Sequence, residues 1–426
     1  MSTENSKRSW AAPFFAIWSG QAASLLGSQL VQFALVWWLT AQTGSEVVLA
    51  TAAMLASLPQ VFIGPFAGVL VDRWNRRRVM IVADAGIALA TLLLLVLNAV
   101  GSMQPWHIYL LMFVRAVGGI FHWPAMQAST SLMVPGEQLA RVGGMNQTLQ
   151  GALSIVSPAL GALLVGILPL YGILAIDVVT ALLAIVPLLF IAIPQPEVET
   201  ADVSERPTVL RDMITGFSYV WGWPGLFIIL LMAMLLNFLS APSFSLMPLL
   251  VTKHFSGGVV EIGALQSALG VGLLVGGVVL SVWGGFRRKV ATSMLGMIGG
   301  GVGMLVVGGA PGSLLWMAIA GIFVTGFMNP IINGPLMALI QSAVDPKMQG
   351  RVFTLVLSLA TAMMPLGYAL GGRLAARFGI SMWFVMAGVA MIGCGSLGFV
   401  IPAVRHIEGN PEIETHVDQA AALDLV

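Results

Sequence analysis

The stretch Gly68-Val-Leu-Val-Asp-Arg-Trp-Asn-Arg-Arg-Arg78 decides how this chain folds. It holds one acid and four arginines, in a chain of which only 9% is charged. Residues 47–71 carry no charge, and after Arg78 only Asp84 interrupts the apolar sequence before Arg115. Because charged side chains stay out of lipid and basic loops stay on the cytoplasmic side, the stretch predicts a hinge between two membrane-spanning helices.

The composition predicts a protein that crosses a membrane many times. Hydrophobic residues make up 58% of the 426 residues, and the mean hydropathy is +0.93. A membrane-spanning helix needs about 20 apolar residues with few charges. Twelve segments meet this condition, near residues 13–40, 47–70, 79–100, 107–130, 142–168, 171–193, 225–250, 259–282, 290–309, 313–341, 352–376 and 380–402. We therefore predict an all-α membrane protein with twelve transmembrane helices.

The positions of the basic residues predict the orientation of these helices. If the chain starts on the cytoplasmic side and crosses an even number of times, most Lys and Arg residues lie in cytoplasmic loops. Cytoplasmic loops characteristically carry such an excess. We expect both termini in the cytoplasm and a multi-pass protein in the lipid bilayer of a bacterial cytoplasmic (inner) membrane. The basic loops are interpreted as solvated anchors, so no nucleic-acid partner is expected.

Two parts of the sequence repeat each other at a nearly constant offset. Residues 134–142 match residues 344–352 at an offset of 210, and Arg77-Arg-Val79 matches Arg288-Lys-Val290 at an offset of 211. This spacing indicates that a six-helix unit was duplicated in the same orientation. The predicted parts are an N-terminal six-helix bundle (1–193), a cytoplasmic linker with an interfacial helix (194–224), a C-terminal six-helix bundle (225–404) and a cytoplasmic polar tail (405–426).

The motif in residues 68–78 carries a family resemblance. It resembles the loop between the second and third helices of the major facilitator superfamily, G-x-L-x-D-R-x-G-R-[KR], with Asn75 in place of one glycine. The resemblance to bacterial macrolide efflux proteins extends along almost the whole chain, and it includes Phe113-Val-Arg-Ala-Val-Gly118, Ser157-Pro-Ala159 and Gly350-Arg-Val-Phe353. It implies two pseudo-symmetric six-helix bundles with a substrate site between them.

The resemblance also implies a gating role for the loop. Asp72 would face the positive N-terminal end of the helix that begins near Arg351, since an anion is favoured there. The arginines would hold neighbouring carbonyls or lipid phosphates. Alternatively, the arginines only set the topology, although topology requires neither an aspartate nor a glycine. The predicted gating residues are Gly68, Asp72, Arg73, Arg76, Arg77 and Arg351.

Ionisable residues inside the predicted spans are the candidates for proton coupling, because a charge at membrane depth costs at least about 2.5 kcal/mol. Arg115 and Asp177 enter the membrane from the same side to similar depths, so they are expected to be able to pair. The alternative for this pair is a permanent, purely structural ion pair. Asp84 is interpreted first as a partner of the arginine loop and His122 as a packing histidine, with proton transfer as the alternative for both.

Polar residues at helical spacing are the candidates for the substrate cavity. Buried carboxylates are few, so recognition would rely on apolar area and neutral hydrogen bonds. The alternative is that these residues only join neighbouring helices. The candidates are Gln21, Ser24, Ser28, Gln32, Gln147, Gln150, Ser154, Asn237, Asn329, Asn333 and Ser358. Pro158 and Gly161 are the residues that remain of a kinked helix motif found in exporters of this superfamily.

These observations predict a secondary active exporter of bulky lipophilic compounds, working by proton-coupled alternating access. Macrolide-like antibiotics are the substrates that the resemblance suggests. The alternatives are export of an endogenous metabolite such as a siderophore and, from another class, a channel or a membrane sensor. No HExxH, G-x-S-x-G or G-x-x-x-x-G-K-[ST] motif is present, which argues against an enzyme and against ATP as the direct energy source. No cofactor or metal is expected, and the protein is expected to work as a monomer.

Overall fold

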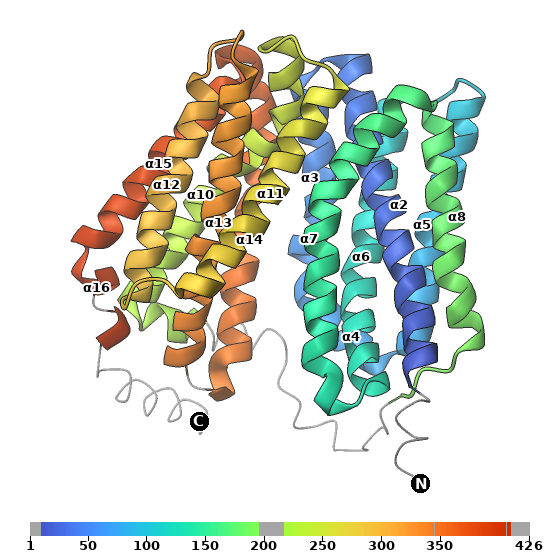
Figure 1. Ribbon diagram of the computed structural model, residues 1–426, viewed down its shortest axis with the longest axis horizontal. Coiled ribbons are helices and arrows are strands. Elements are labelled where there is room, and N and C mark those ends of the chain that lie inside the picture. The colour runs from blue at the N-terminus through green and yellow to red at the C-terminus, as the bar shows by residue number, and fades with distance from the viewer. Residues whose placement is uncertain (1–9, 196–216, 345, 406, 410–426) are drawn as a thin grey trace. The chain divides into compact units, whose positions relative to one another are not determined.

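The computed structural model describes residues 10–195, 217–344, 346–405 and 407–409 (Figure 1). Within these ranges the regular structure is helical throughout, and 11 helices are long and apolar enough to cross a membrane. The chain divides into two compact units. One comprises Met1–Ala201 and Gly257–Ser267, and the other comprises Asp202–Ser256 and Ala268–Val426. The predicted boundaries of the linker and the tail stay predictions.

The first bundle contains the helices that precede the predicted linker. Its helices α2, α5 and α6 each run the length of a membrane span, and α2 packs against α7 and α8. Helix α5 packs against α6 and α8, while α3 and α4 pack against α6. The helices are α2 (Ala11–Thr43), α3 (Glu46–Phe62), α4 (Gly64–Arg73), α5 (Arg76–Ala99), α6 (Pro105–Met133), α7 (Gly136–Ile167) and α8 (Leu170–Phe190).

The second bundle repeats this plan. Helix α10 packs against α14 and α15, as α2 packs against α7 and α8, and α12 packs against α13 and α15, as α5 packs against α6 and α8. The helices are α10 (Pro224–Lys253), α11 (Val259–Trp283), α12 (Lys289–Gly309), α13 (Leu315–Ala343), α14 (Pro346–Phe378) and α15 (Ser381–Val400), followed by the short α16 (Pro402–Arg405) and η2 (Ile407–Gly409). The first residues of α11, up to Ser267, are grouped with the first compact unit. The recurring pairs confirm two pseudo-symmetric six-helix bundles.

The second predicted span, residues 47–70, is divided into α3 and α4. Helix α3 contains Pro59 and ends one residue before Ile63, and α4 begins at Gly64 with Pro65 in its first turn. A proline in a helix removes a backbone donor and crowds the preceding turn. The Ile63 N–H still donates to the Pro59 carbonyl at 2.8 Å, so the two helices follow each other with almost no gap. Together, α3 and α4 account for the second predicted span, which brings the number of spans from 11 to the predicted twelve.

Short polar signals end one helix and begin the next. Gly44 adopts a left-handed conformation (φ 55°) at the end of α2, and its N–H donates to the Thr40 carbonyl. The Ser45 hydroxyl accepts from the Val48 N–H and so caps α3. Asn75, which replaces a glycine of the superfamily motif, accepts from the Arg78 N–H at 3.0 Å and caps α5.

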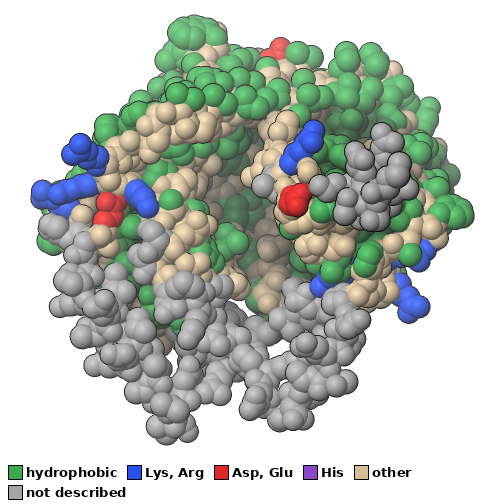
Figure 2. Space-filling view, turned by 60° about the horizontal axis from the view of Figure 1, so that its bottom comes forward, with side chains coloured by type: hydrophobic (Ala, Val, Ile, Leu, Met, Phe, Trp, Pro, Cys, Tyr) green, Lys and Arg blue, Asp and Glu red, His purple; other side chains and the backbone are tan. Residues whose placement is uncertain are grey.

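The described surface is strongly apolar. Figure 2 shows hydrophobic side chains over much of one face, with Lys and Arg gathered in a few clusters. Phe190 on α8 and Val282 on α11 are each 84% exposed, which is expected for side chains that face lipid. Of the predicted interfacial stretch, residues 217–221 are helical, and residues 196–216 lie outside the described ranges.

Candidate functional site

A buried ion pair joins α6 to α8 in the first bundle. Arg115 Nη1 lies 2.7 Å from Asp177 Oδ2, and the two side chains are only 10% and 1% exposed. A lone charge at membrane depth is unfavourable by about 2.5 to 3.5 kcal/mol or more. The attraction between the two charges therefore offsets part of the desolvation penalty of each. The pair that the sequence led us to expect is present.

Two hydroxyl groups complete the environment of this ion pair. Ser28 Oγ on α2 donates to Asp177 Oδ1 at 3.2 Å, and Thr91 Oγ1 on α5 donates to Asp177 Oδ2 at 3.1 Å. Arg115 Nη2 donates to the Ser28 carbonyl at 3.0 Å, and Nη1 also lies 3.3 Å from Thr91 Oγ1. We call Ser28, Thr91, Arg115 and Asp177 the Arg115 cluster. It ties together four helices through one carboxylate and one guanidinium.

A second polar cluster lies along the same helices. Gln21 Nε2 on α2 donates to Asp84 Oδ2 on α5 at 2.9 Å, and both residues are buried. His122 Nε2 on α6 lies 3.4 Å from Asp84 Oδ1, which is within ion-pair distance, although the geometry falls short of a hydrogen bond. We call Gln21, Asp84 and His122 the Asp84 cluster. Protonation of the imidazole would convert this loose contact into a charged pair.

The two clusters are separated by the same number of residues on each shared helix. Gln21 precedes Ser28 by seven residues on α2, and Asp84 precedes Thr91 by seven on α5. On α6, which runs in the opposite direction, Arg115 precedes His122 by seven. Seven residues are about two helical turns, or about 10 Å along the axis. The first bundle therefore contains two polar layers, each with one carboxylate.

The arginines at the start of α5 bind backbone carbonyls. Arg77 donates through Nε to the Leu188 carbonyl and through Nη2 to the Leu189 carbonyl, the latter at 2.6 Å. These carbonyls belong to the last turn of α8, where a cation is favoured by the helix dipole. Arg76 Nη1 lies 3.5 Å from the Ala128 carbonyl of α6. Both arginines therefore connect helices within the first bundle.

The other predicted gating residues lie on α4 and α14. Gly68, Asp72 and Arg73 belong to α4 and Arg351 belongs to α14, but their side chains lie outside the described residues. The contact between Asp72 and the N-terminal end of α14 stays a prediction. Asp84 was expected to contact the arginine loop. Among the described residues, its hydrogen bond is to Gln21 and its ion-pair contact is to His122.

The cavity candidates differ in their surroundings. Gln21 and Ser24 are buried, Gln21 and Ser28 belong to the two polar clusters, and Gln32 is half-buried. Ser154 bonds to the Gly151 carbonyl and Asn237 to the Ala233 carbonyl, each on its own helix. The exposed candidates are Gln147, Asn329 and Asn333. The half-buried candidates are Gln150 and Ser358. Their role in a cavity stays a prediction.

A small cavity of about 30 Å³ lies between α2, α6 and α7. Gln21, His122 and Gln150 line it, together with Asn146, whose Oδ1 accepts from Trp18 Nε1 at 2.8 Å. It has room for about one water molecule. The Asp84 cluster therefore has a polar neighbour on the α7 side, from which a water molecule could reach His122.

Pro158 and Gly161 both lie within α7. Pro158 is inside the helix and buried. A Cβ atom added at Gly161 would lie 2.9 Å from Phe33 Cδ1, so the absence of a side chain lets α7 approach α2 closely. Their expected role in a helix kink stays a prediction.

Sequence reasoning missed Thr91. It lies in a leucine-rich segment of α5 and is fully buried at 0% exposure. The available signal was its position seven residues after Asp84, which places both on one face of the helix. Among the described residues, no group of three or more His, Cys, Asp or Glu side chains is arranged to hold a metal ion.

Comparison with known proteins identifies the family. A family model described as the Major Facilitator Superfamily matches residues 17–367. The chain belongs to the major facilitator superfamily. It is a multi-pass membrane protein of a transporter family, and the predicted fold class and the resemblance are both confirmed.

Two curated relatives of this superfamily member are efflux proteins. The chain is 34% identical over 400 residues to macrolide efflux protein A of Streptococcus pyogenes, with 93% of this chain and 97% of that protein covered. It is 26% identical over 418 residues to the multidrug efflux pump Tap of Mycolicibacterium fortuitum, with 95% and 98% covered. The fold is similar to that of a POT family transporter (TM-score 0.71, 11% identity, 92% and 96% covered).

Proposed function

We propose that this protein exports bulky lipophilic compounds, with macrolide-like antibiotics as the substrate class. The observation that carries this proposal is the end-to-end similarity to macrolide efflux protein A. The polar stripes provide neutral hydrogen-bonding groups on α2, α7, α10, α13 and α14, which suits large substrates with many ether, ester and hydroxyl oxygens. The proposed setting is the cytoplasmic membrane, with both termini inside and a monomer as the working unit.

The proposed energy source is a proton that binds to Asp177. In the charged state, Arg115 and the two hydroxyl groups hold the carboxylate and connect α2, α5, α6 and α8. A proton on Asp177 removes the negative charge that pairs with Arg115, while the guanidinium keeps its bond to the Ser28 carbonyl. The link between α6 and α8 is then weaker, and the bundle can change shape. Substrate binding and proton binding would favour different states of this link.

The Arg115 cluster fits such a role because both of its states have hydrogen-bond partners. The neutral carboxyl group can donate to Ser28 Oγ, and Thr91 Oγ1 stays within reach of Arg115. A buried charge that loses its partner is strongly destabilising, by about 3 to 5 kcal/mol. The neighbouring hydroxyl and carbonyl groups would reduce this penalty for Arg115 during the protonated part of the cycle.

The test measures drug accumulation in an efflux-deficient bacterial host. Cells that express the protein should accumulate less of a labelled macrolide, and an uncoupler that collapses the proton gradient should abolish the difference. Asp177→Asn should abolish it as well, since the amide cannot take up a proton. Thr51→Ala, which removes an exposed hydroxyl group that bonds to the Val47 carbonyl of α3, provides a control outside the proposed machinery. If accumulation of no macrolide falls, the substrate class is wrong; if the uncoupler has no effect on export, proton coupling is wrong.

Counterflow in proteoliposomes separates the proposed transporter from a channel. Unlabelled substrate inside the vesicles should drive transient uptake of labelled substrate against its gradient. A channel does not exchange substrate in this way, so the absence of counterflow with a substrate that the cells do export would contradict alternating access.

A further inference from the structure

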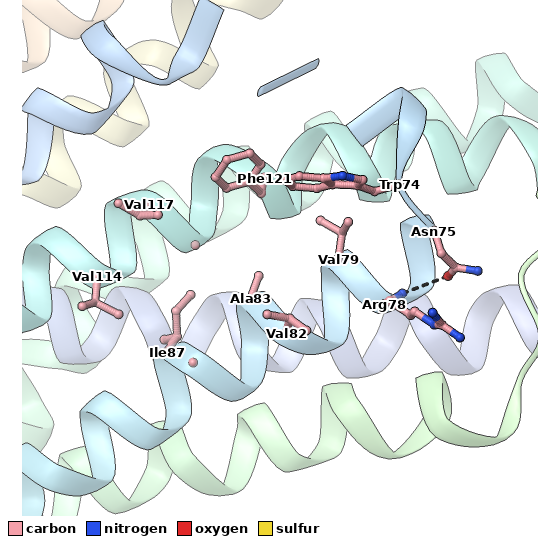
Figure 3. Close-up of a pocket in the computed structure, with 12 residues that line it drawn as sticks. Trp74, Asn75, Arg78, Val79, Val82, Ala83, Ile87, Val114, Val117 and Phe121 are labelled. Carbon is pink, nitrogen blue, oxygen red and sulfur yellow. Dashed lines mark hydrogen bonds between the residues drawn. The ribbon is translucent and has the colours of Figure 1, made fainter. Parts of the chain in front are cut away.

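An apolar groove runs along the outer side of the first bundle, between α5 and α6. Its volume is about 580 Å³, within the range of roughly 300 to 1,000 Å³ that is typical of ligand sites. The rings of Trp74 and Phe121 lie 5.8 Å apart along one wall, and valine side chains of α5 form the other (Figure 3). Gly86 also lines the groove, and an added Cβ there would meet nothing within 4 Å.

Arg78 and Asn75 stand at one end of this groove (Figure 3). Arg76 and Arg77, which precede Arg78, bind carbonyls of α6 and α8. No hydrogen bond or ion pair joins the exposed Arg78 guanidinium to any other described side chain or carbonyl. The Asn75 carbonyl oxygen caps α5, and its amide nitrogen points away from that bond (Figure 3). The groove therefore ends at a positive charge and an amide donor.

The dimensions of the groove match one leaflet of a bilayer. Its lining on α5 extends from Arg78 to Ile87, which is about 13 Å along the helix axis. Half of the hydrocarbon core is about 15 Å thick. Trp74 lies at the same end as Arg78, and tryptophan is enriched where a membrane protein meets the headgroup layer. An acyl chain that filled the groove would place its phosphate beside Arg78.

We propose that this groove binds one acyl chain of an anionic phospholipid, whose phosphate is held by Arg78 and Asn75. The apolar walls fit the acyl chain, and the charge at the end selects the anionic headgroup. The site is also close to the Asp84 cluster in sequence. Ala83 and Phe121 line the groove, and each immediately precedes a member of that cluster, Asp84 and His122. A bound lipid would thus set the spacing of the two helices that carry this contact.

Native mass spectrometry of the full-length protein in detergent tests the proposal. Phosphatidylglycerol and phosphatidylethanolamine with identical acyl chains are added in equal amounts. The wild type should retain phosphatidylglycerol preferentially. Arg78→Gln should weaken that binding about fivefold, since a basic residue near the headgroup contributes about 1 kcal/mol, and should abolish the preference. Gly86→Phe should weaken the binding of both lipids because it fills the groove.

Matched variants control for charge and for size. Arg288→Gln removes an exposed arginine before α12, and Gly119→Phe adds a ring at an open glycine of α6 outside the groove. Both should bind lipid as the wild type does. If Gly86→Phe is not recovered in folded form, Val82→Trp fills the groove from a side chain that is 71% exposed.

Three results would overturn the proposal. Arg78→Gln could keep the full preference for phosphatidylglycerol, which would show that the headgroup is not held there. The filled groove could retain lipid with unchanged affinity. Finally, filling the groove could leave lipid binding unchanged and reduce binding of the exported drug, which would assign the groove to the transported compound instead.

Discussion

The first bundle buries Asp84, Asp177 and Arg76, whereas every buried polar residue in the described part of the second bundle is an uncharged serine or threonine. The second bundle is closely packed through glycines instead. A Cβ atom added at Gly301 on α12 would lie 2.7 Å from the Gly388 carbonyl oxygen on α15. The two bundles have the same arrangement of helices but differ in the residues at the helix contacts, which include charged residues in the first bundle and many glycines in the second.

This difference shows that duplication of a fold does not duplicate its chemistry. A charge inside a membrane protein is unfavourable unless it has a partner, so it persists mainly where it has a function. Small residues at helix contacts provide close packing and carry no such penalty. We infer that the first bundle responds to protons and that the second contributes mainly packing and polar substrate contacts.

The strongest test of this comparison is the loss of Asp177. Asp177→Ala leaves the Arg115 guanidinium buried without its carboxylate, so stability should fall by about 3 kcal/mol and uncoupler-sensitive export should cease. Thermal unfolding in detergent and drug accumulation measure the two effects. The double variant Asp177→Asn with Arg115→Gln should recover much of the stability and none of the coupling. Recovery of proton-driven export in the double variant would contradict the assignment of chemistry to the first bundle.

A smaller effect is expected from crowding the second bundle. Gly301→Leu forces α12 away from α15 and should destabilise the protein by about 2 kcal/mol, as overpacking of a close contact does. Gly393→Leu on α15 is the matched control, because an added Cβ there meets nothing within 4 Å. The pH dependence of the remaining transport should be unchanged. A shift in that pH dependence would mean that the second bundle also takes part in coupling.

The smallest change in stability, about 1 kcal/mol, is expected from Asp84→Asn, which keeps the acceptor for Gln21 and removes the charge facing His122. Because the contact between α5 and α6 then loses its charge, the variant should also transport substrate more slowly than the wild type.

Initial transport rates at a constant proton gradient measure this effect. His254→Gln removes a histidine of the second bundle and should leave the rate as in the wild type. Equal rates for Asp84→Asn and the wild type would reduce the Asp84 cluster to a packing role.

The sequence predicted the helices well because membrane insertion depends on local composition. Runs of about 20 apolar residues are recognisable without knowledge of their neighbours. The break at Ile63 was not predicted, since Pro59 and Pro65 are tolerated inside many membrane helices and their effect depends on packing. The pairing of Arg115 with Asp177 was predictable because the sequence predicts similar depths for the two charges and offers few alternative partners.

The partners of the other polar residues were not predictable in the same way. The polar stripe of α2 predicts either a cavity role or bonds to neighbouring helices for Ser28 and Gln21, and the structure shows bonds to Asp177 and Asp84. Thr91 was passed over, although it donates directly to Asp177. A helical stripe indicates which residues share a face, and it does not indicate which helix that face meets.

By itself, the sequence determined the all-α membrane fold, the number of spans and the family, because hydropathy and motif spacing are properties of the chain read in order. Only the tertiary structure decided that two polar layers lie seven residues apart on three helices. It also decided that Arg76 and Arg77, at the start of α5, bind carbonyl groups of α6 and α8. These features depend on how each helix is rotated about its axis and on which helices are neighbours, and packing determines both.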